Sequence, residues 1–157
     1  AILIRGCAMV IYIDTREKKN AHIMSYFLRH GIVFQSKKLD CGDYWADGSP
    51  VIIERKSSLL ELAGNITKDG GKRISAELKR IPADKRLVLL VEENISLDAV
   101  KDWRSPRTKF LGVALHRYLL AWMDKYQIEV QFCHKNSSGK RIAALLCGGE
   151  GNDADIY

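Results

Sequence analysis

Short runs of β-branched and other apolar residues alternate along this chain with segments in which apolar residues recur every three or four positions. The runs predict buried strands at residues 9–14, 51–54, 86–93 and 128–133. The periodic segments predict helices at residues 21–30, 57–66, 72–81, 109–125 and 138–147, with a shorter one at 96–103. We therefore expect an α/β domain whose central mixed sheet carries helices on both faces.

Turn and cap residues mark the boundaries of these elements. Residues 32–50 have the pattern of strands around turns, and Asp47-Gly48 followed by Ser49-Pro50 is a strong hairpin signal. Ser57 or Ser58 is a suitable N-cap for the helix that follows the strand at 51–54.

The 157 residues are close to the size of one domain, and no internal linker is long enough to divide them. We predict a single domain over residues 9–147, an N-terminal extension over 1–8 and a disordered acidic tail over 148–157. No apolar run approaches the roughly 20 residues that span a bilayer, so no membrane contact is expected. The four cysteines form no CxxC pair, which favours reduced thiols in a cytosolic protein over structural zinc.

The net charge of the chain indicates the class of its binding partner. The formal net charge is +6, although the last eight residues hold three acids and no base. A basic surplus of this kind favours a polyanionic partner, of which nucleic acid is the first candidate.

Charged residues that suit phosphodiester chemistry gather at the predicted strand ends. They are Asp14, Arg16, Glu17, Asp43, Glu54, Arg55 and Lys56. Because strand side chains alternate between faces, Glu54 and Lys56 point one way and Arg55 points the other, and the hairpin would bring Asp43 alongside. Two carboxylates suit Mg²⁺, and a lysine can position a water or neutralise charge on a phosphate. A solvated strand end is the alternative, since these residue types are common.

Three segments in this order and spacing resemble the nuclease domain of the XPF family of structure-specific DNA endonucleases. They are IDTRE (13–17), GDYW (42–45) and VIIERKSS (51–58). That family carries the pattern GDx(n)ERKx(3)D, a variant of the PD-(D/E)xK motif of the restriction-endonuclease-like superfamily. The resemblance continues through residues 62–81, 86–93 and 110–132 and covers roughly 10–147. It implies the restriction-endonuclease-like fold.

The resemblance implies catalytic roles for the GD and ERK positions. Asp43 and Glu54 would be the main ligands of Mg²⁺, for which Mn²⁺ would substitute, and the backbone carbonyl of Arg55 is a further candidate ligand. Lys56 would serve the attacking water or the scissile phosphate, and Arg55 would brace the site or contact DNA.

It also implies roles for the first strand end. Asp14 and Glu17 would lie at the metal edge as catalytic residues, with Asp14 as a further metal ligand. Arg16 would hold the site or a DNA phosphate, and an ion pair of Arg16 with Glu17 or Asp43 is an equal alternative.

One position departs from the family pattern. The last acid should stand four residues after the lysine, where this chain has Leu60. Glu61 follows one residue later, so a one-residue insertion would let Glu61 replace the missing acid. The alternative is that Glu61 is a residue of the helix surface.

Basic residues outside the strand ends form a predicted DNA contact surface. The segment 68–86 holds seven Lys and Arg against three acids, and its glycines would let the backbone approach a phosphate. Such contacts give affinity without sequence readout, and a solvated helix face is the alternative. The predicted contacts are Arg16, Lys68, Lys72, Arg73, Lys79, Arg104 and Arg107.

The leading hypothesis is a Mg²⁺-dependent endonuclease that hydrolyses phosphodiester bonds in flaps, forks or junctions during DNA repair or recombination. The small size favours a phage or mobile element, and the protein would act in a prokaryotic or virus-infected cytoplasm, or in a eukaryotic nucleus. By resemblance, the helix at 109–125 is expected to pair two copies into a homodimer. The alternative is a non-catalytic, nuclease-like DNA-binding or scaffolding subunit, which the intact GD and ERK oppose and the missing acid favours.

Overall fold

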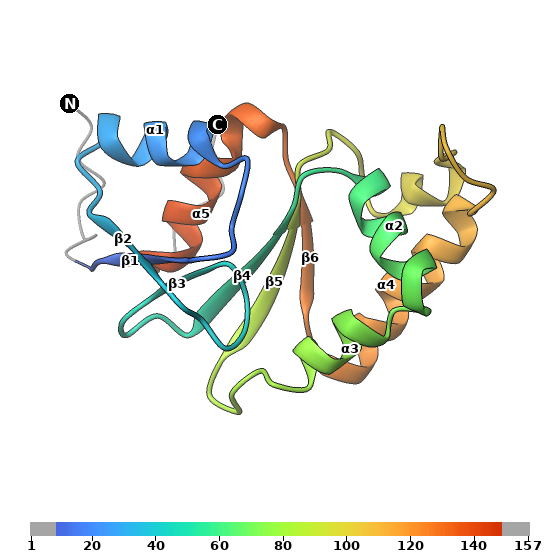
Figure 1. Ribbon diagram of the computed structural model, residues 1–157, viewed down its shortest axis with the longest axis horizontal. Coiled ribbons are helices and arrows are strands. Elements are labelled where there is room, and N and C mark those ends of the chain that lie inside the picture. Colours follow the sequence, from blue (N-terminus) through green and yellow to red (C-terminus); the bar gives the residue numbers. More distant parts are fainter. Residues whose placement is uncertain (1–8, 149–157) are drawn as a thin grey trace.

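A computed structural model describes residues 9–148, so the predicted extension and all but the first residue of the predicted tail lie outside the described residues. The described chain forms a six-stranded sheet in the order β2-β1-β3-β4-β5-β6 (Figure 1). The strands are β1 (Ile11–Asp14), β2 (Phe34–Lys37), β3 (Tyr44–Ala46), β4 (Val51–Lys56), β5 (Arg86–Val91) and β6 (Glu129–Phe132). The pairs β1–β3 and β3–β4 are antiparallel and the other three are parallel, so the predicted mixed sheet is confirmed.

Every predicted helix is present. The helices are α1 (Ala21–Arg29), α2 (Leu59–Asp69), α3 (Lys72–Leu78), α4 (Gly112–Tyr126) and α5 (Ser138–Leu146), with short 3-10 turns η1 (Asp98–Asp102) and η2 (Lys135–Ser137). Ser58 caps α2, because its hydroxyl accepts a hydrogen bond of 3.0 Å from the Glu61 backbone N–H. In the described part of the chain no helix is long and apolar enough to cross a bilayer.

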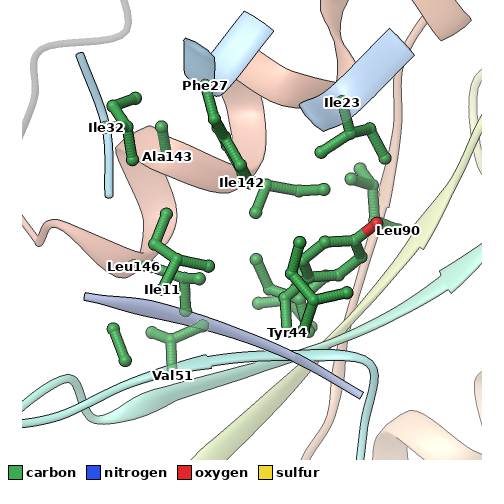
Figure 2. Close-up of a cluster of buried hydrophobic side chains, with 14 of the residues drawn as sticks. Ile11, Ile23, Phe27, Ile32, Tyr44, Val51, Leu90, Ile142, Ala143 and Leu146 are labelled. Carbon is green, nitrogen blue, oxygen red and sulfur yellow. The ribbon is translucent and has the colours of Figure 1, made fainter. Parts of the chain in front are cut away.

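The two faces of the sheet bury two separate hydrophobic cores. Helices α1 and α5 pack on one face, where Phe27 and Ile142 meet Ile11, Tyr44 and other strand residues (Figure 2). Helices α2, α3 and α4 pack on the opposite face of the β4–β6 half (Figure 1). Consecutive residues of β4 therefore feed different cores, and each buried Ile or Leu side chain contributes about 1.5–3 kcal/mol.

The α2–α4 layer does not extend over β1 and β3. On that face Tyr12 and Trp45 are only partly buried, whereas Ile11, Tyr44 and Ala46 on the α1–α5 face are fully buried. Helices thus flank both faces, as predicted, but in the described part of the chain no helix covers one face of the β1–β3 half.

The three cysteines within residues 9–148 fall into two groups. Cys41 and Cys133 are buried free thiols. Cys147 is disulfide-bonded, so the prediction of reduced cysteines is wrong for this residue.

Candidate active site

The core contacts of β4 place its charged end. Val51, Ile52 and Ile53 are buried, and β4 continues two residues beyond its predicted end because Glu54 and Lys56 pair with Leu89 and Val91 of β5. Glu54 and Lys56 emerge on the α2–α4 face, with Lys56 Nζ 3.5 Å from Glu54 Oε1. Arg55 turns to the opposite face, as the alternation predicted.

Asp43 is fixed beside Glu54 by two backbone hydrogen bonds. Its N–H donates to the Ile53 carbonyl at 2.7 Å, and its Oδ2 accepts from the Arg55 N–H at 2.8 Å. Gly42 allows this close approach. Its φ is +77°, and a Cβ there would lie 2.3 Å from Ile52 Cγ2, so a larger residue would push the strands apart. The hairpin therefore brings Asp43 and Glu54 together, as predicted.

The two carboxyl groups share a poorly solvated environment. Burial, together with the negative charge of Glu17, raises the pKa of Asp43 to about 7. Burial, with Asp43 and Glu77 nearby, raises the pKa of Glu54 well above its ordinary value. Within residues 9–148, Glu54 Oε2 is buried without a hydrogen-bond partner. A cation bound between these carboxylates would relieve both the repulsion and the missing contact.

The donor set suits a hard divalent cation. Within the described residues no three His, Cys, Asp or Glu side chains converge on one point, so the site offers Asp43 and Glu54 as a pair. Mg²⁺ commonly takes one or two carboxylates and keeps several waters, and Mn²⁺ accepts the same oxygen ligands. The residues present therefore fit Mg²⁺ or Mn²⁺.

Arg55 is held by acids on the other side of the sheet. It donates from Nε and Nη2 to the two oxygens of Glu17, at 2.8 and 3.1 Å, and from Nη2 to the Lys18 carbonyl at 2.7 Å. Its Nη1 donates to Glu92 Oε1. Because Arg55 is only 6% exposed, this geometry fits the predicted bracing role rather than a DNA contact.

Sequence reasoning assigned no role to Glu92. This side chain is 8% exposed, and besides Arg55 it contacts His22 Nε2 and accepts a hydrogen bond from the Ser138 hydroxyl, each at 2.5 Å. The signal that singled out Glu54, an acid directly after a buried apolar strand, is equally present at Glu92.

Glu77 was missed in the same way. Its Oε1 accepts the Gly42 N–H at 2.9 Å, and its charge adds to the raised pKa of Glu54. Glu77 therefore places a third carboxyl group at the edge of the site. In the sequence Glu77 is one of three acids in the basic segment 68–86, and nothing in that segment distinguishes it from the other two.

Asp14 and Arg16 pair with each other. Arg16 Nε lies 2.8 Å from Asp14 Oδ2, so the alternative of an Arg16 pair with Glu17 or Asp43 is wrong. Asp14 Oδ1 accepts the Leu39 N–H at 2.8 Å. Burial raises the pKa of Asp14, but the hydrogen bonds from Arg16 and Leu39 outweigh it and the net pKa is lowered. Both carboxylate oxygens of Asp14 thus already accept hydrogen bonds, which disfavours the predicted metal contact of Asp14.

Glu61 completes the start of α2. Its Oε2 accepts from the Ser57 N–H at 2.7 Å and from the Ser57 hydroxyl at 2.6 Å, while its own N–H donates to Ser58. This reciprocal arrangement resembles a capping box. It fits the alternative of a helix-surface residue, although Glu61 also lines the cleft described next.

An open cleft surrounds the two carboxylates. Its charged lining consists of Arg16, Glu17, Lys18, Lys19, Asp43, Glu54, Arg55, Lys56, Glu61 and Arg107. Arg16 and Arg107 were predicted DNA contacts, whereas Lys18 and Lys19 were missed. The other predicted contacts are exposed but lie outside the cleft lining: Lys68, Lys72, Arg73, Lys79 and Arg104.

Comparisons with known proteins agree with this architecture. A family model described as the ERCC4 domain matches residues 13–145. Among solved structures, XPF from Aeropyrum pernix is similar over 87% of this chain, with a TM-score of 0.67 and 22% sequence identity. The chain spans 63% of the length of that structure. None of the curated proteins matches the sequence. The structural likeness confirms the predicted fold.

Proposed function

Because the chain belongs to the ERCC4 domain family, we propose that it is a Mg²⁺-dependent endonuclease that hydrolyses phosphodiester bonds in branched DNA. One observation carries the proposal. Asp43 and Glu54 are desolvated side by side next to Lys56, in a cleft whose rim holds further basic side chains.

The side chains divide the chemistry between them. Asp43 and Glu54 would hold the metal through their oxygens. When bound, Mg²⁺ polarises the scissile phosphate and lowers the pKa of an attacking water. Lys56, 3.5 Å from Glu54, would orient that water or neutralise charge that develops on the phosphate. Arg55 would act as a positioning residue, because it holds Glu17 and the Lys18 carbonyl at the cleft edge.

The basic rim of the cleft would bind the DNA backbone. Arg16, Lys18, Lys19 and Arg107 bring four positive charges to the lining. Contacts of this kind position DNA without reading its sequence, which suits an enzyme that recognises the shape of a branch. Flaps, forks and junctions are therefore the proposed substrates, in DNA repair or recombination.

Cleavage of labelled fork, flap and junction DNA in Mg²⁺ or Mn²⁺ tests the proposal. We expect Asp43→Asn and Lys56→Ala to lower the rate by on the order of 100-fold or more, because each removes a charge next to the reacting phosphate. Lys101→Gln is a matched control, since it breaks an exposed 2.7 Å ion pair with Asp98 outside the cleft lining. Wild-type rates in both site variants would disprove the assignment.

Leu60 favours a second candidate, a non-catalytic nuclease-like subunit, because it stands where the family pattern has an acid. Calorimetric titration with Mg²⁺ separates the two. A catalytic site binds the metal in a manner that Asp43→Asn abolishes, whereas a subunit that has lost its activity shows no carboxylate-dependent binding.

We also propose a homodimer. Leu111, Val113 and Leu120, at the start and along the outer side of α4, are 43–54% exposed apolar side chains. They would contact a second copy, which sedimentation velocity would detect as a dimer that Leu120→Glu weakens.

A further inference from the structure

Two aromatic rings lie next to each other on the open face of the β1–β3 half. Tyr12 and Trp45 are register partners in the antiparallel β1–β3 pair, and their ring centroids are 6.1 Å apart with an interplanar angle of 43°. Their strand neighbours Ile11, Tyr44 and Ala46 are buried on the other face. Within residues 9–148 no helix covers this side of the two strands, and both rings stay partly exposed. Trp45 also packs against the α2–α4 core, where its Nε1 is buried without a hydrogen-bond partner among the described residues.

Two lysines complete this surface. Lys37 Nζ lies 4.7 Å from the Tyr12 ring centroid and 5.4 Å from that of Trp45. Lys85 Nζ lies 5.4 Å from the Trp45 ring. We call Tyr12, Trp45, Lys37 and Lys85 the aromatic platform.

The charge of the platform is positive. Asp47 is the carboxylate that touches it, through a 3.0 Å hydrogen bond from the Tyr12 hydroxyl. Among the described residues neither Lys37 nor Lys85 has a carboxylate partner within 4 Å, and Lys85 Nζ donates to the Ser49 carbonyl instead. Neither ammonium group is therefore ion-paired within the described residues, and both can contact an anionic ligand.

The platform adjoins the cleft but is separate from it. Asp14 stands two residues after Tyr12 in β1, and Asp43 stands two residues before Trp45, directly before β3, a spacing of about 7 Å along an extended chain. The connection between β2 and β3 contacts Asp14, whose Oδ1 accepts the Leu39 N–H. No platform residue lines the cleft.

We infer that the aromatic platform binds an unpaired DNA strand next to the cleft. Bases would stack on Tyr12 and Trp45, and Lys37 and Lys85 would turn from the ring faces to neighbouring phosphates. Ring stacking needs free base faces, which a single strand offers and a duplex buries. The inference rests on the proposed function, because a branched substrate supplies an unpaired strand. It would let the protein distinguish a branch from a plain duplex.

Fluorescence anisotropy in EDTA tests the inference without cleavage. The probes are a labelled oligo(dT), a fork with an unpaired arm and a blunt duplex. We expect the double variant Tyr12→Leu, Trp45→Leu to weaken oligo(dT) and fork binding by on the order of 10-fold while changing duplex binding less than about 2-fold. Leucine keeps apolar bulk in both strands. The control is Tyr126→Leu, which removes another ring that carries a lysine, Lys125, at 5.5 Å.

Two further measurements do not depend on the folding of the double variant. Lys37→Gln leaves both rings in place and should reduce the slope of log affinity against log salt for oligo(dT) by about 0.7. Photocrosslinking of bromodeoxyuridine oligonucleotides to the wild type should label Tyr12 or Trp45. Unchanged oligo(dT) affinity in the double variant, equal weakening for duplex, or crosslinks elsewhere alone would overturn the inference. EDTA prevents metal-dependent cleavage, so the anisotropy experiment tests binding alone. If single-strand binding does not depend on the platform, the nuclease proposal still stands. If the cleavage test fails, single-strand binding to the platform can still be measured.

Discussion

Glu54 and Arg55 are neighbours in β4, but their side chains enter opposite electrostatic environments. On the α2–α4 face, Glu54 and Asp43 are like charges in a poorly solvated site, and one Glu54 oxygen has no hydrogen-bond partner among the described residues. On the α1–α5 face, Arg55 is ion-paired with both Glu17 and Glu92. Strand β4 therefore presents Glu54 to a site where two carboxyl groups share one lysine, Lys56, and presents Arg55 to a site with two acids.

The two environments of β4 predict different consequences of mutation, one for catalysis and one for folding stability. Buried carboxyl groups with too few cationic partners cost free energy, and a bound cation would offset that cost. A buried charge with several partners costs little free energy while all partners are present, but the loss of one leaves the others buried without their counter-charge. We therefore expect mutations on the Arg55 side to act mainly on folding, and mutations on the Glu54 side to act mainly on metal binding and catalysis.

The largest effect on stability is expected from Arg55→Met. It leaves the Glu17 and Glu92 carboxylates buried without their common partner, and breaking a buried pair in this way costs roughly 3–5 kcal/mol. Urea unfolding in EDTA measures the change in the free energy of unfolding.

Arg86→Met is the matched control for this prediction. Its 2.5 Å pair with Glu129 is about half exposed on both sides, so its loss should cost at most about 1 kcal/mol. Equal destabilisation by the two variants would remove the proposed contrast between the faces of β4.

The sequence predicted the residues whose positions follow from local rules and missed the residues that distant elements supply. The opposite directions of Glu54 and Arg55, and the place of Asp43, follow from strand alternation and one hairpin, which are local rules. Family membership and fold, expected from the GD and ERK segments, are confirmed. Partners that distant elements supply were missed: Glu92 directly follows β5 and Glu77 lies in α3, and no periodicity pairs them with the site.

Tertiary contacts also moved one helix boundary. The apolar pattern started the long helix at Lys109, but α4 begins at Gly112. A Cβ on Gly112 would lie 2.3 Å from the Val100 carbonyl oxygen, so α4 starts where its glycine packs against η1. Apolar spacing along a single sequence carries no information about that contact.

The second effect is a dependence of stability on pH that originates on the Glu54 face. The pKa of Asp43 is about 7 in the folded chain against an ordinary value of 3.8, so the folded state binds the proton more tightly than the unfolded state. Without metal, stability should therefore fall by on the order of 4 kcal/mol as pH rises from about 4 to about 7.

Chemical unfolding in EDTA across this pH range measures the effect, and Asp43→Asn should flatten most of the slope. Saturating Mg²⁺ should oppose this fall, because metal binding requires the ionised carboxylates and therefore strengthens as pH rises toward 7. A fall in stability from pH 4 to 7 in Asp43→Asn that is as steep as in the wild type would contradict this assignment of the titration.

The smallest effect decides to which side of the comparison Glu61 belongs. Its carboxylate accepts two hydrogen bonds from Ser57 at the start of α2, so it has the satisfied partners typical of a structural acid, yet it lines the cleft. If capping is its role, Glu61→Gln should lower the free energy of unfolding by about 0.5–1 kcal/mol and leave calorimetric Mg²⁺ affinity unchanged. Ser58→Ala, which removes the other half of the cap, should give a similar loss of stability and the same metal affinity. A tenfold or greater loss of Mg²⁺ affinity in Glu61→Gln, with Ser58→Ala unaffected, would instead make Glu61 the substitute for the acid that Leu60 replaces, and would place this part of α2 with the metal-binding carboxylates of the Glu54 face.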